Sequence, residues 1–400
     1  MQKLGIYIHI PFCDQICHYC DFAKTSNYSQ KYASDYLARI KKDISQLKTI
    51  EPLKSFKGRM SLYLGGGTPS VFAGEYAGIF EELSEYLGKD SEITIEANPE
   101  HIDEDRLKAW KEVGFNRISM GVQSFNDEGL KFLTRTHSGD TAKQAIKLAK
   151  KYFDNVNADL IYGWTGQSLD LWRQDLAIMT ELQPHHISLY SLTYEPATVF
   201  GRRKERGLMV PETDDRLAAY YDLAKEALKG ALYQHEEISN WHVAGKEAFH
   251  NNLYWTGENY IGLGLGAHGY LPSVGNYGIR YSFAKNWRQF LEADESSFKD
   301  VESWLKSRKA VIESERDCED WLLEYIGCGL RSKSGIDLDV IAKKTGLEFI
   351  PRNSLLEGLK QSLLKRKDNI LTLKEDEWFR ETAWSVEVAM SWKKQEGTRL

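Results

Sequence analysis

The chain of 400 residues has few cysteines, few prolines and no long apolar run. Five cysteines in a chain of this length exclude the disulfide framework of a small secreted domain. No segment approaches the roughly 20 apolar residues that span a bilayer, and the first residues lack the apolar core of a signal peptide. A net charge of −6 argues against a general nucleic-acid binder. These absences favour a cytoplasmic protein that binds no nucleic acid.

Strand candidates alternate with amphipathic helix candidates from residue 4 to about residue 194. The strand candidates are LGIYIHI, RMSLYLGGG, EITIEA, RISMGVQS, VNADLIYG and HHISLYSLTY. Such alternation predicts a parallel sheet with helices outside it. Six βα units are fewer than the eight of a closed TIM barrel, so we predict an α/β fold built on a partial (β/α)6 TIM-like barrel. A doubly wound sheet is the alternative.

The pattern divides the chain into a barrel core at 1–195, an extension at 196–311 and a C-terminal domain at 312–400. The last region contains helical stretches such as DLDVIAKKTG and SLLEGLKQSLLKR, followed by the strand-like NILTLKEDEW. This order resembles a winged-helix module, which is a fold and does not fix a function. The region lacks a basic stripe, so we expect it to pack or dock rather than to bind DNA.

Three of the five cysteines, Cys13, Cys17 and Cys20, fall within eight residues, in HIPFCDQICHYCDF. A structural zinc ion takes four ligands, which would require His9 or His18 beside the thiols. Three thiolates on a [4Fe–4S] cluster leave one iron open to a small molecule, which suits an enzyme better than an electron carrier. Ordinary buried or redox-active thiols are a third alternative, which does not explain the spacing.

Further polar and glycine-rich motifs follow the next strand candidates. GGGTP ends the second strand, EANP the third and GVQSF the fourth, and Asp159 lies within the fifth. The carboxyl ends of parallel strands meet at one edge of an α/β sheet, where sites are assembled. We therefore expect these motifs and the cysteines to form one site.

Together these segments resemble a known family. The spacing C-x3-C-x2-C is similar to that of the radical S-adenosylmethionine (SAM) superfamily, and the other motifs resemble, in order, those of its oxygen-independent coproporphyrinogen III oxidase family. The motifs are YIHIPFC at 7–13, GGGTPS at 65–70, IEANPE at 95–100, MGVQSFND at 120–127, RTH at 135–137 and DLIYG at 159–163. The resemblance covers most of residues 4 to 285 and implies that 1–195 is a radical SAM core.

The resemblance implies a [4Fe–4S] cluster on Cys13, Cys17 and Cys20, with the amino and carboxylate groups of SAM on the fourth iron. It also implies SAM contacts at nine positions. They are Tyr7, Tyr19, Gly66, Gly67, Thr68, Glu96, Gln123, Arg135 and Asp159. The residue types suit this chemistry, because glycines let the backbone approach SAM, carboxylates accept from hydroxyl or ammonium groups, and an arginine fork matches a carboxylate.

Two segments depart from the oxidase pattern. WTGQ at 164–167 stands where the family usually has LPGQ, so the loop beside the SAM site lacks a stiffening proline. The oxidases resemble C-x3-C-x2-C-x-C, and the last cysteine of that pattern falls at Phe22. In this respect the chain is similar to the heme chaperone group of the family, the HemW proteins, which bind heme and deliver it to apo-hemoproteins.

A second motif also resembles the heme chaperone group. FHNNLYW matches the HNxxYW motif of the heme chaperone group, as His250, Asn251, Tyr254 and Trp255. The resemblance implies heme binding there, since histidine is the usual axial ligand of heme iron and aromatic rings offer flat apolar faces. The alternative is structural: His250 hydrogen-bonds within a turn and the aromatic rings fill the core.

The resemblance therefore predicts a heme chaperone that holds a [4Fe–4S] cluster, SAM and heme and passes heme to apo-hemoproteins of the respiratory chain. Delivery to that chain is compatible with peripheral contact with the membrane. One alternative is a radical SAM oxidase that decarboxylates coproporphyrinogen III, and another is an iron–sulfur scaffold without turnover. The sequence leaves open the heme acceptors, the cleavage of SAM and dimerisation.

Overall fold

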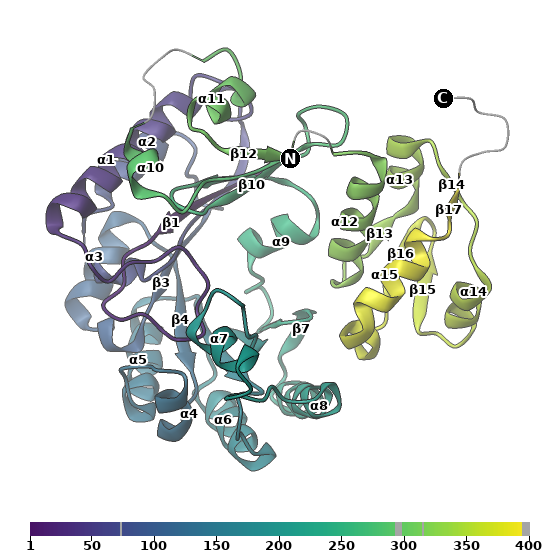
Figure 1. Cartoon of the computed structure of the whole chain (residues 1–400), viewed down its shortest axis with the longest axis horizontal. Helices are drawn as coiled ribbons and strands as arrows, with labels where there is room; N and C mark the ends of the chain where they lie inside the picture. Colours follow the sequence, from purple (N-terminus) through teal and green to yellow (C-terminus); the bar gives the residue numbers. More distant parts are fainter. Residues whose placement is uncertain (73, 293–297, 314–315, 394–400) are drawn as a thin grey trace.

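The computed structural model describes residues 1–72, 74–292, 298–313 and 316–393. Its largest feature is a mixed sheet of twelve strands, in the order β12-β11-β10-β9-β1-β2-β3-β4-β5-β6-β8-β7, with helices along its outer side (Figure 1). The strands of this sheet are β1 (Gln2–Ile10), β2 (Gly58–Gly66), β3 (Glu92–Ala97), β4 (Arg117–Gln123), β5 (Val156–Tyr162), β6 (His186–Ser191), β7 (Gln234–Glu237), β8 (Asn240–His242), β9 (Asn259–Leu263), β10 (His268–Leu271), β11 (Ile279–Ser282) and β12 (Val311–Glu313).

The six strands β1 to β6 are parallel, and each lies beside its neighbours in chain order. The α-helices before the C-terminal part of the chain are α1 (Gln30–Leu47), α2 (Ala77–Leu83), α3 (Glu104–Val113), α4 (Asp127–Phe132), α5 (Gly139–Tyr152), α6 (Leu169–Leu182), α7 (Val199–Glu205), α8 (Asp214–Gly230), α9 (Phe249–Trp255), α10 (Trp287–Leu291) and α11 (Val301–Ser307). A doubly wound sheet reverses its strand order at a switch point, and this sheet does not. The predicted partial (β/α)6 barrel is confirmed, and the doubly wound alternative is wrong.

The barrel strands are apolar toward the helices and more polar toward the lumen. In β1, Leu4, Ile6 and Ile8 are fully buried, whereas Tyr7 between them is half-buried. Side chains alternate between the two faces of a strand, so Tyr7 points into the lumen. Glu96 of β3 is half-buried in the same way, on the face opposite the buried Ile95. The lumen is therefore lined by polar and aromatic side chains that solvent partly reaches.

Later strands extend both edges of this barrel sheet. β9 pairs with β1 in parallel, and β10, β11 and β12 follow in antiparallel order. On the other edge, β8 and β7 add antiparallel strands to β6. One hydrophobic core runs from Leu4 to Leu305, so residues 1–195 and 196–311 share a sheet and a core. The division of the chain into three domains stays a prediction.

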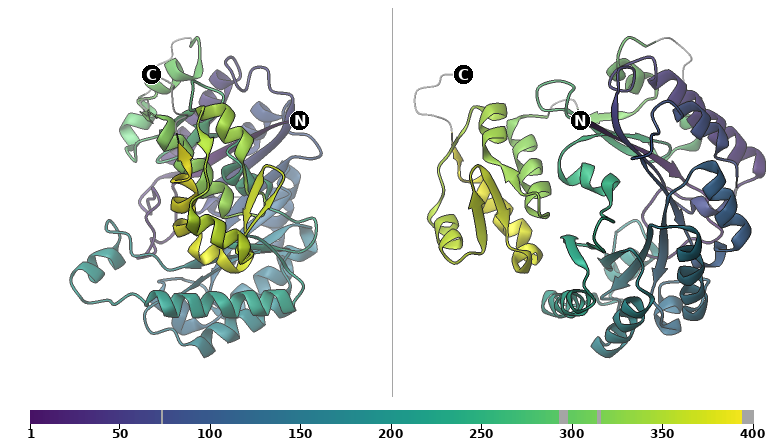
Figure 2. Two further views of the ribbon diagram at one scale, coloured as in Figure 1. Left: turned by 90° about the vertical axis from the view of Figure 1, so that its right-hand side faces the viewer. Right: turned by 180° about the vertical axis from the view of Figure 1, so that it is seen from behind.

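The C-terminal part has a separate core between Trp321 and Trp392 and lies to one side of the barrel, beside α9 (Figure 2). Its elements are α12 (Cys318–Leu330), β13 (Ile336–Asp337), α13 (Leu338–Thr345), β14 (Glu348–Phe349), α14 (Asn353–Lys360), β15 (Leu364–Lys367), β16 (Ile370–Leu373), α15 (Glu381–Ala389) and β17 (Trp392–Lys393). Three helices and the antiparallel sheet β13-β16-β15 have the element order of the predicted winged helix. No helix in the described ranges is both long and apolar enough to cross a membrane.

Candidate functional site

The cysteine motif follows β1 in a loop whose two ends are fastened together. The Cys13 amide donates to the Thr25 carbonyl (3.0 Å), and the Thr25 amide donates to the Pro11 carbonyl (2.7 Å). The segment after β2 also holds the start of the loop, since the Thr68 amide donates to the Phe12 carbonyl (2.8 Å). These bonds join backbone groups, and the three cysteines form no disulfide bond.

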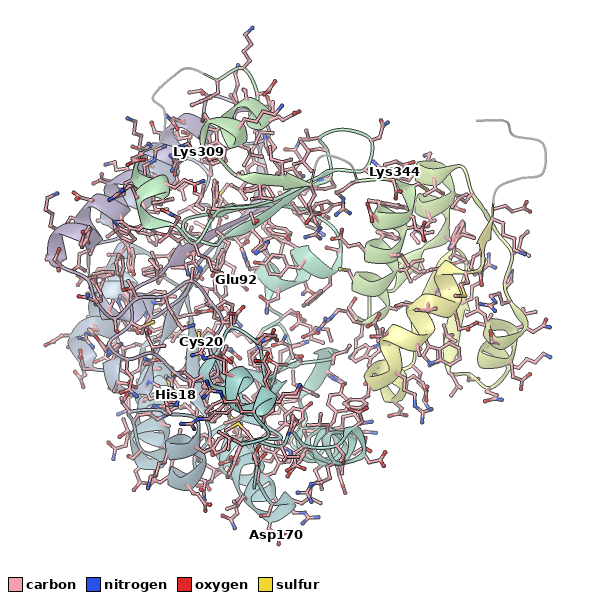
Figure 3. All side chains as sticks on the ribbon, viewed as in Figure 1. His18, Cys20, Glu92, Asp170, Lys309 and Lys344 are labelled. Carbon is pink, nitrogen blue, oxygen red and sulfur yellow. The ribbon has the colours of Figure 1, made fainter. Side chains whose placement is uncertain are left out.

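Two distant segments hold the middle of this loop. The His18 amide donates to Thr134 Oγ1 (3.0 Å), and the His18 carbonyl accepts from the Phe200 amide (3.1 Å). Phe200 belongs to α7, and Figure 3 labels His18 and Cys20 in this region. The sequence offers no signal for either anchor, because both lie more than 100 residues from the cysteines.

The three thiols lie close enough to interact. Cys13 is buried, and Cys17 and Cys20 are half-buried. Burial raises the pKa of Cys13 to about 11, and the other two thiols add to the shift. Arg135 Nη1 lies 3.5 Å from Cys17 Sγ, a contact that stabilises a thiolate. Within the described residues, no group of three or more His, Cys, Asp or Glu side chains is arranged to hold one metal ion.

Close packing explains the glycines that end β2. Gly66 has φ 111°, and an added Cβ would lie 2.3 Å from the His9 ring. That ring is fixed, because Tyr7 OH bonds Nδ1 (3.0 Å) and a backbone carbonyl bonds Nε2 (2.6 Å). At Gly67, a Cβ would lie 2.7 Å from the Ile10 carbonyl oxygen. Packing is thus a second reason for these glycines beside the predicted approach of SAM, and His9 is not free to complete a zinc site.

Two carboxylates face the lumen near the cysteine loop. Glu96 accepts from Tyr63 OH (2.8 Å) and from the Gly66 amide (2.8 Å). Burial, together with repulsion from Asp159, raises the pKa of Glu96 to about 7. Asp159 accepts from Asn157 Nδ2 (2.6 Å), and burial raises its pKa to about 6. Both side chains are half-buried, so their oxygens can accept from the hydroxyl or ammonium groups of a ligand.

Arg135 is largely engaged by the protein itself. Its Nη2 donates to Asn98 Oδ1 (2.7 Å) and to the Gly121 carbonyl (3.0 Å), while Nη1 contacts Cys17. These bonds tie the cysteine loop to β4 and to the segment after β3. The predicted bond to the SAM carboxylate stays a prediction.

The other predicted SAM contacts lie at the same end of the barrel. Gln123 ends β4 at a β-bulge with φ 67°, a left-handed conformation that strains a glutamine. The Tyr19 ring lies 6.5 Å from the Phe200 ring, and burial raises the pKa of Tyr19. Thr68 is buried, and its side chain hydrogen-bonds the Cys13 thiol. Tyr19 thus lies on the cysteine loop itself, and the other eight positions lie on β1 to β5 or on the segments that follow them.

Trp164 packs the loop that lacks the proline against an apolar cluster. Its side chain is 2% exposed, and its ring lies 5.3 Å from that of Phe132 in an apolar cluster with Phe200. The Gly163 amide also donates to Gln167 Oε1 (2.7 Å). The expected loss of loop stiffness is offset by these contacts.

The predicted heme motif forms α9, which packs against the N-terminal halves of β1 and β2. His250 is buried, with Nδ1 bonded to Ser61 Oγ (2.7 Å) and Nε2 bonded to Tyr254 OH (2.7 Å). Burial, with repulsion from Arg117, lowers the pKa of His250 to about 3, so its ring is neutral. Both ring nitrogens are engaged, as the structural alternative requires. Axial ligation of heme would need the Tyr254 hydroxyl to move.

Glu92 holds the N-terminus of α9. The amides of Phe249 and His250 both donate to its carboxylate (2.9 Å each), and Figure 3 labels Glu92 beside this helix. The N-cap residue Ala248 has no side chain to accept these bonds, so a buried carboxylate from β3 satisfies the open amides. The sequence places Glu92 in a strand candidate but offers no link to residue 249.

The other motif residues are less buried than His250. Asn251 and Tyr254 are half-buried. The Arg331 guanidinium lies 3.9 Å over the Trp255 ring and donates to Glu237 (2.8 Å). The heme motif therefore lies between the lumen and the C-terminal part of the chain.

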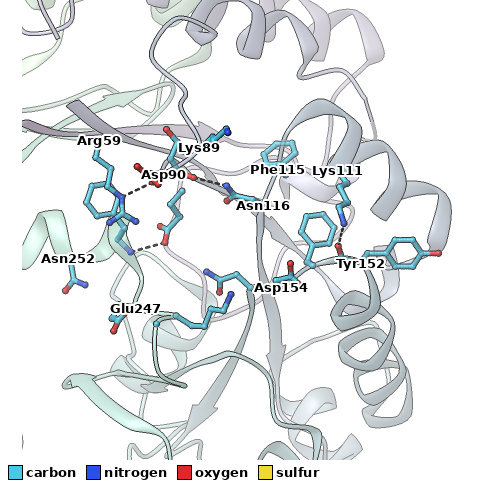
Figure 4. Close-up of a pocket in the computed structure, with 17 residues that line it drawn as sticks. Arg59, Lys89, Asp90, Lys111, Phe115, Asn116, Tyr152, Asp154, Glu247 and Asn252 are labelled. Atoms are coloured by element: carbon cyan, nitrogen blue, oxygen red, sulfur yellow. Dashed lines mark hydrogen bonds between the residues drawn. The ribbon is translucent and has the colours of Figure 1, made fainter. Parts of the chain in front are cut away.

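A separate cleft of about 620 Å³ opens at the N-terminal ends of β3, β4 and β5 (Figure 4). Its charged residues are Arg59, Lys89, Lys111 and Lys246 together with Asp90, Glu92, Asp154 and Glu247. The two signs balance, so the cleft has no anion-binding character as a whole. It borders α9 through Phe249 and Asn252, at the opposite end of the strands from the cysteine loop.

The chain is similar to proteins of one superfamily. Residues 7–177 match the model of the Radical SAM superfamily. A heme chaperone HemW of Lactococcus lactis is 34% identical over 364 residues, which cover 90% of each chain. A heme chaperone HemW of Escherichia coli is 36% identical over 298 residues, 73% of this chain and 76% of that protein. The solved coproporphyrinogen III oxidase (HemN) of Escherichia coli is alike in fold, with a TM-score of 0.73 and 20% identity over 96% of this chain and 90% of that chain.

Proposed function

This chain belongs to the HemW heme chaperone family of the radical SAM superfamily, and we propose that it binds heme and delivers it to apo-hemoproteins. The similarity to a heme chaperone over nine tenths of both chains carries the proposal. Phe22 supports it, because the oxidase pattern has a cysteine at that position. We propose apo-hemoproteins of the respiratory chain as acceptors, reached by a peripheral contact with the membrane.

We further propose that Cys13, Cys17 and Cys20 hold a [4Fe–4S] cluster. The residues fit this group, since three thiols outside disulfide bonds lie on one loop that is fastened at its base. Arg135 beside Cys17 offsets the negative charge of a thiolate. When bound, the cluster supplies an electron for the reductive chemistry of SAM. The loop itself keeps the three thiols at the end of the barrel where the lumen opens.

The SAM site in this proposal uses both side chains and backbone of the barrel rim. Glu96 and Asp159 accept from the ribose hydroxyls or the ammonium group. Gly66 and Gly67 leave room for the backbone to approach the ligand. The Gln123 amide lies over Gly121 of the same strand, near Arg135. Together these residues bind and orient SAM beside the cysteine loop.

In this proposal, heme binds to the motif on α9. His250 becomes an axial ligand through Nε2 once the Tyr254 hydroxyl releases it. Trp255 belongs to the same helix, and the Arg331 guanidinium lies over one face of its ring. Binding that displaces an existing hydrogen bond is readily reversed, which suits a protein that hands its ligand on.

Two assays test the proposal against the oxidase alternative. The first reconstitutes the cluster without oxygen, adds SAM, dithionite and coproporphyrinogen III, and looks for protoporphyrinogen. The second titrates heme into the wild type and His250→Ala and follows the Soret band. We expect no porphyrinogen product, saturable heme binding by the wild type and a changed spectrum in the variant. Product at enzymatic rates, or a wild type that binds no heme, would overturn the chaperone function.

A further inference from the structure

Arg117 is a buried cation that forms no ion pair within the residues that the structure describes. It is the first residue of β4, and its neighbour Ile118 packs on the helix side, so Arg117 points into the lumen. The side chain is 2% exposed, and its Nε has no hydrogen-bond partner within the described residues. A guanidinium stays charged at every physiological pH, and an isolated buried charge is costly. The position therefore favours an anion that comes from outside the protein.

The carboxylates of the lumen do not fill this role. Glu96 bonds Tyr63 and Gly66, and Asp159 bonds Asn157. Both feel Arg117 through charge alone, because neither forms an ion pair with it in the part of the chain that the structure describes.

Two further buried carboxylates, Glu92 and Glu236, have other partners. Glu92 accepts the first two amides of α9, and Glu236 bonds His186 and Asn252. Moving Glu92 toward Arg117 would open that helix end. The titratable groups around the guanidinium also include Tyr63, His186 and His250, none of which is anionic near neutral pH. Among the described residues, each carboxylate near Arg117 is thus hydrogen-bonded to another partner.

Arg117 lies at the opposite end of β4 from Gln123. Five residues separate the two, so their Cα atoms are about 20 Å apart at 3.3 Å per residue. Glu96 and Asp159 lie between these ends, and both are close enough to Arg117 for its charge to act on them. His250 is also close enough for the charge of Arg117 to lower its pKa.

One aromatic ring of the lumen lies between Arg117 and the heme motif. Tyr63 pairs through Thr94 with Arg117 in the strand register, and its ring is half-buried. The Tyr63 ring lies 5.0 Å from the His250 ring. A half-buried aromatic face near a buried cation suits a planar molecule that carries a carboxylate.

We propose that Arg117 binds a carboxylate of the ligand that enters the lumen, and that this ligand is heme, held through a propionate. The inference rests on the proposed heme function and adds a recognition element to it. A guanidinium and a carboxylate form two parallel hydrogen bonds, which fix orientation as well as position. Arg117 thus places the porphyrin with one acidic edge toward the floor of the barrel.

The test compares heme with heme dimethyl ester, in which both propionates are blocked. Each is titrated into the wild type, Arg117→Met, Arg117→Lys and Lys89→Met, with the Soret band as readout. Lys89 is the control, because it is an exposed cation of the separate cleft. We expect the wild type to prefer heme over the ester by roughly 10- to 100-fold, as for a hydrogen bond to a charged group. Arg117→Met loses this preference, Arg117→Lys keeps part of it and Lys89→Met keeps all of it.

Several outcomes separate the inference from the proposed function. A wild type that binds heme and ester equally, or an Arg117→Met variant that keeps the preference, overturns the role of Arg117 and leaves the heme function standing. A wild type that binds neither overturns both. A preference lost only in Lys89→Met moves the propionate to the cleft and refutes the lumen site.

The melting temperature and the binding of SAM test two other roles for Arg117. Arg117→Met removes an uncompensated charge, so its ligand-free melting temperature should be equal to or above that of the wild type; a large fall assigns Arg117 a structural role and contradicts the inference. SAM and decarboxylated SAM are titrated in parallel. If Arg117→Met weakens SAM but not its decarboxylated form, the carboxylate belongs to SAM and the heme assignment is wrong.

Discussion

The two ends of the barrel lumen are built differently. At the C-terminal ends of the strands, Glu96 and Asp159 are half-buried, and the cysteine loop is held mainly by backbone hydrogen bonds. At the N-terminal ends, His250 is buried, and both of its ring nitrogens are bonded to side chains. The rim thus offers thiols outside disulfide bonds and partly exposed acceptors, whereas at the heme motif both ring nitrogens of the buried histidine are hydrogen-bonded.

This difference indicates two modes of ligand binding. A ligand at the rim meets groups that are already in place, and a ligand at His250 must displace the Tyr254 hydroxyl. Lost hydrogen bonds of this kind cost about 1 kcal/mol each when both partners find others. We therefore expect tight, preformed binding at the rim and reversible binding at α9.

The largest expected effect is at the rim. Cys13→Ala should abolish the absorbance of the reconstituted cluster near roughly 400 nm, as for thiolate-bound iron–sulfur groups. Heme titration of the same variant should be unchanged, because α9 uses no thiol. Cys318→Ala in α12 is the control and should reconstitute normally. A cluster that survives in Cys13→Ala would mean that the proposed ligands are wrong.

The next effect concerns the support of the heme motif. Glu92→Gln replaces a buried carboxylate that accepts two amides of α9, so the free energy of unfolding should fall by about 2–3 kcal/mol. Urea unfolding measures this change, and heme binding should weaken with it. Glu81→Gln is the control, since Glu81 is exposed and its carboxylate pairs with Lys41 (3.4 Å). Equal stability of the two variants would show that Glu92 does not hold the helix.

The stability of the folded chain should depend on pH because of two carboxylates at the rim. The pKa of Glu96 is raised to about 7 in the folded chain, above an unfolded value of about 4.3. The folded state therefore binds the proton more tightly, and the resulting stabilisation, complete below pH ~4, is lost as the pH rises through 7. Asp159, with its pKa raised to about 6, acts in the same direction.

Glu96→Gln isolates the larger part of this effect. Melting temperatures of the variant between pH 4 and 8 should vary less than those of the wild type, with the residual slope due to Asp159. SAM binding by the wild type should strengthen as Glu96 ionises, while binding by the variant should not. An unchanged melting profile in Glu96→Gln would contradict the assigned shift.

The smallest effect is expected at Tyr254. Tyr254→Phe frees His250 Nε2, so heme affinity should rise a few-fold while stability falls by about 1 kcal/mol. A Soret titration measures the affinity. Tyr233→Phe is the control, because its hydroxyl bonds the Pro184 carbonyl away from the motif. Unchanged affinity would indicate that Nε2 is not the ligand atom.

The sequence pattern was enough to predict the barrel, because strand candidates alternate with amphipathic helix candidates from residue 4 to about residue 194. The positions of Thr134, Phe200 and Glu92 could not be predicted. Each acts on a segment far away in the chain, and only the closed fold brings the partners together. Arg117 shows the same limit, since an arginine that starts a strand looks like an exposed one until its neighbours are known.

The packing of Trp164 marks another limit. Its loop lacks the usual proline, which the sequence shows, but the apolar cluster that compensates is assembled from α4, α7 and the loop itself. The heme motif was equally ambiguous, because ligation and hydrogen bonding use the same imidazole nitrogens. Sequence patterns identify such groups without revealing which partner they have.

The central claim is that this chain hands heme to other proteins, and the transfer rate tests it most directly. Heme-loaded protein is mixed with increasing amounts of an apo-hemoprotein, and the acceptor's Soret band is followed with time. A chaperone that acts by contact predicts a transfer rate that rises with acceptor concentration. A rate that is independent of the acceptor and equal to spontaneous heme loss would contradict the account.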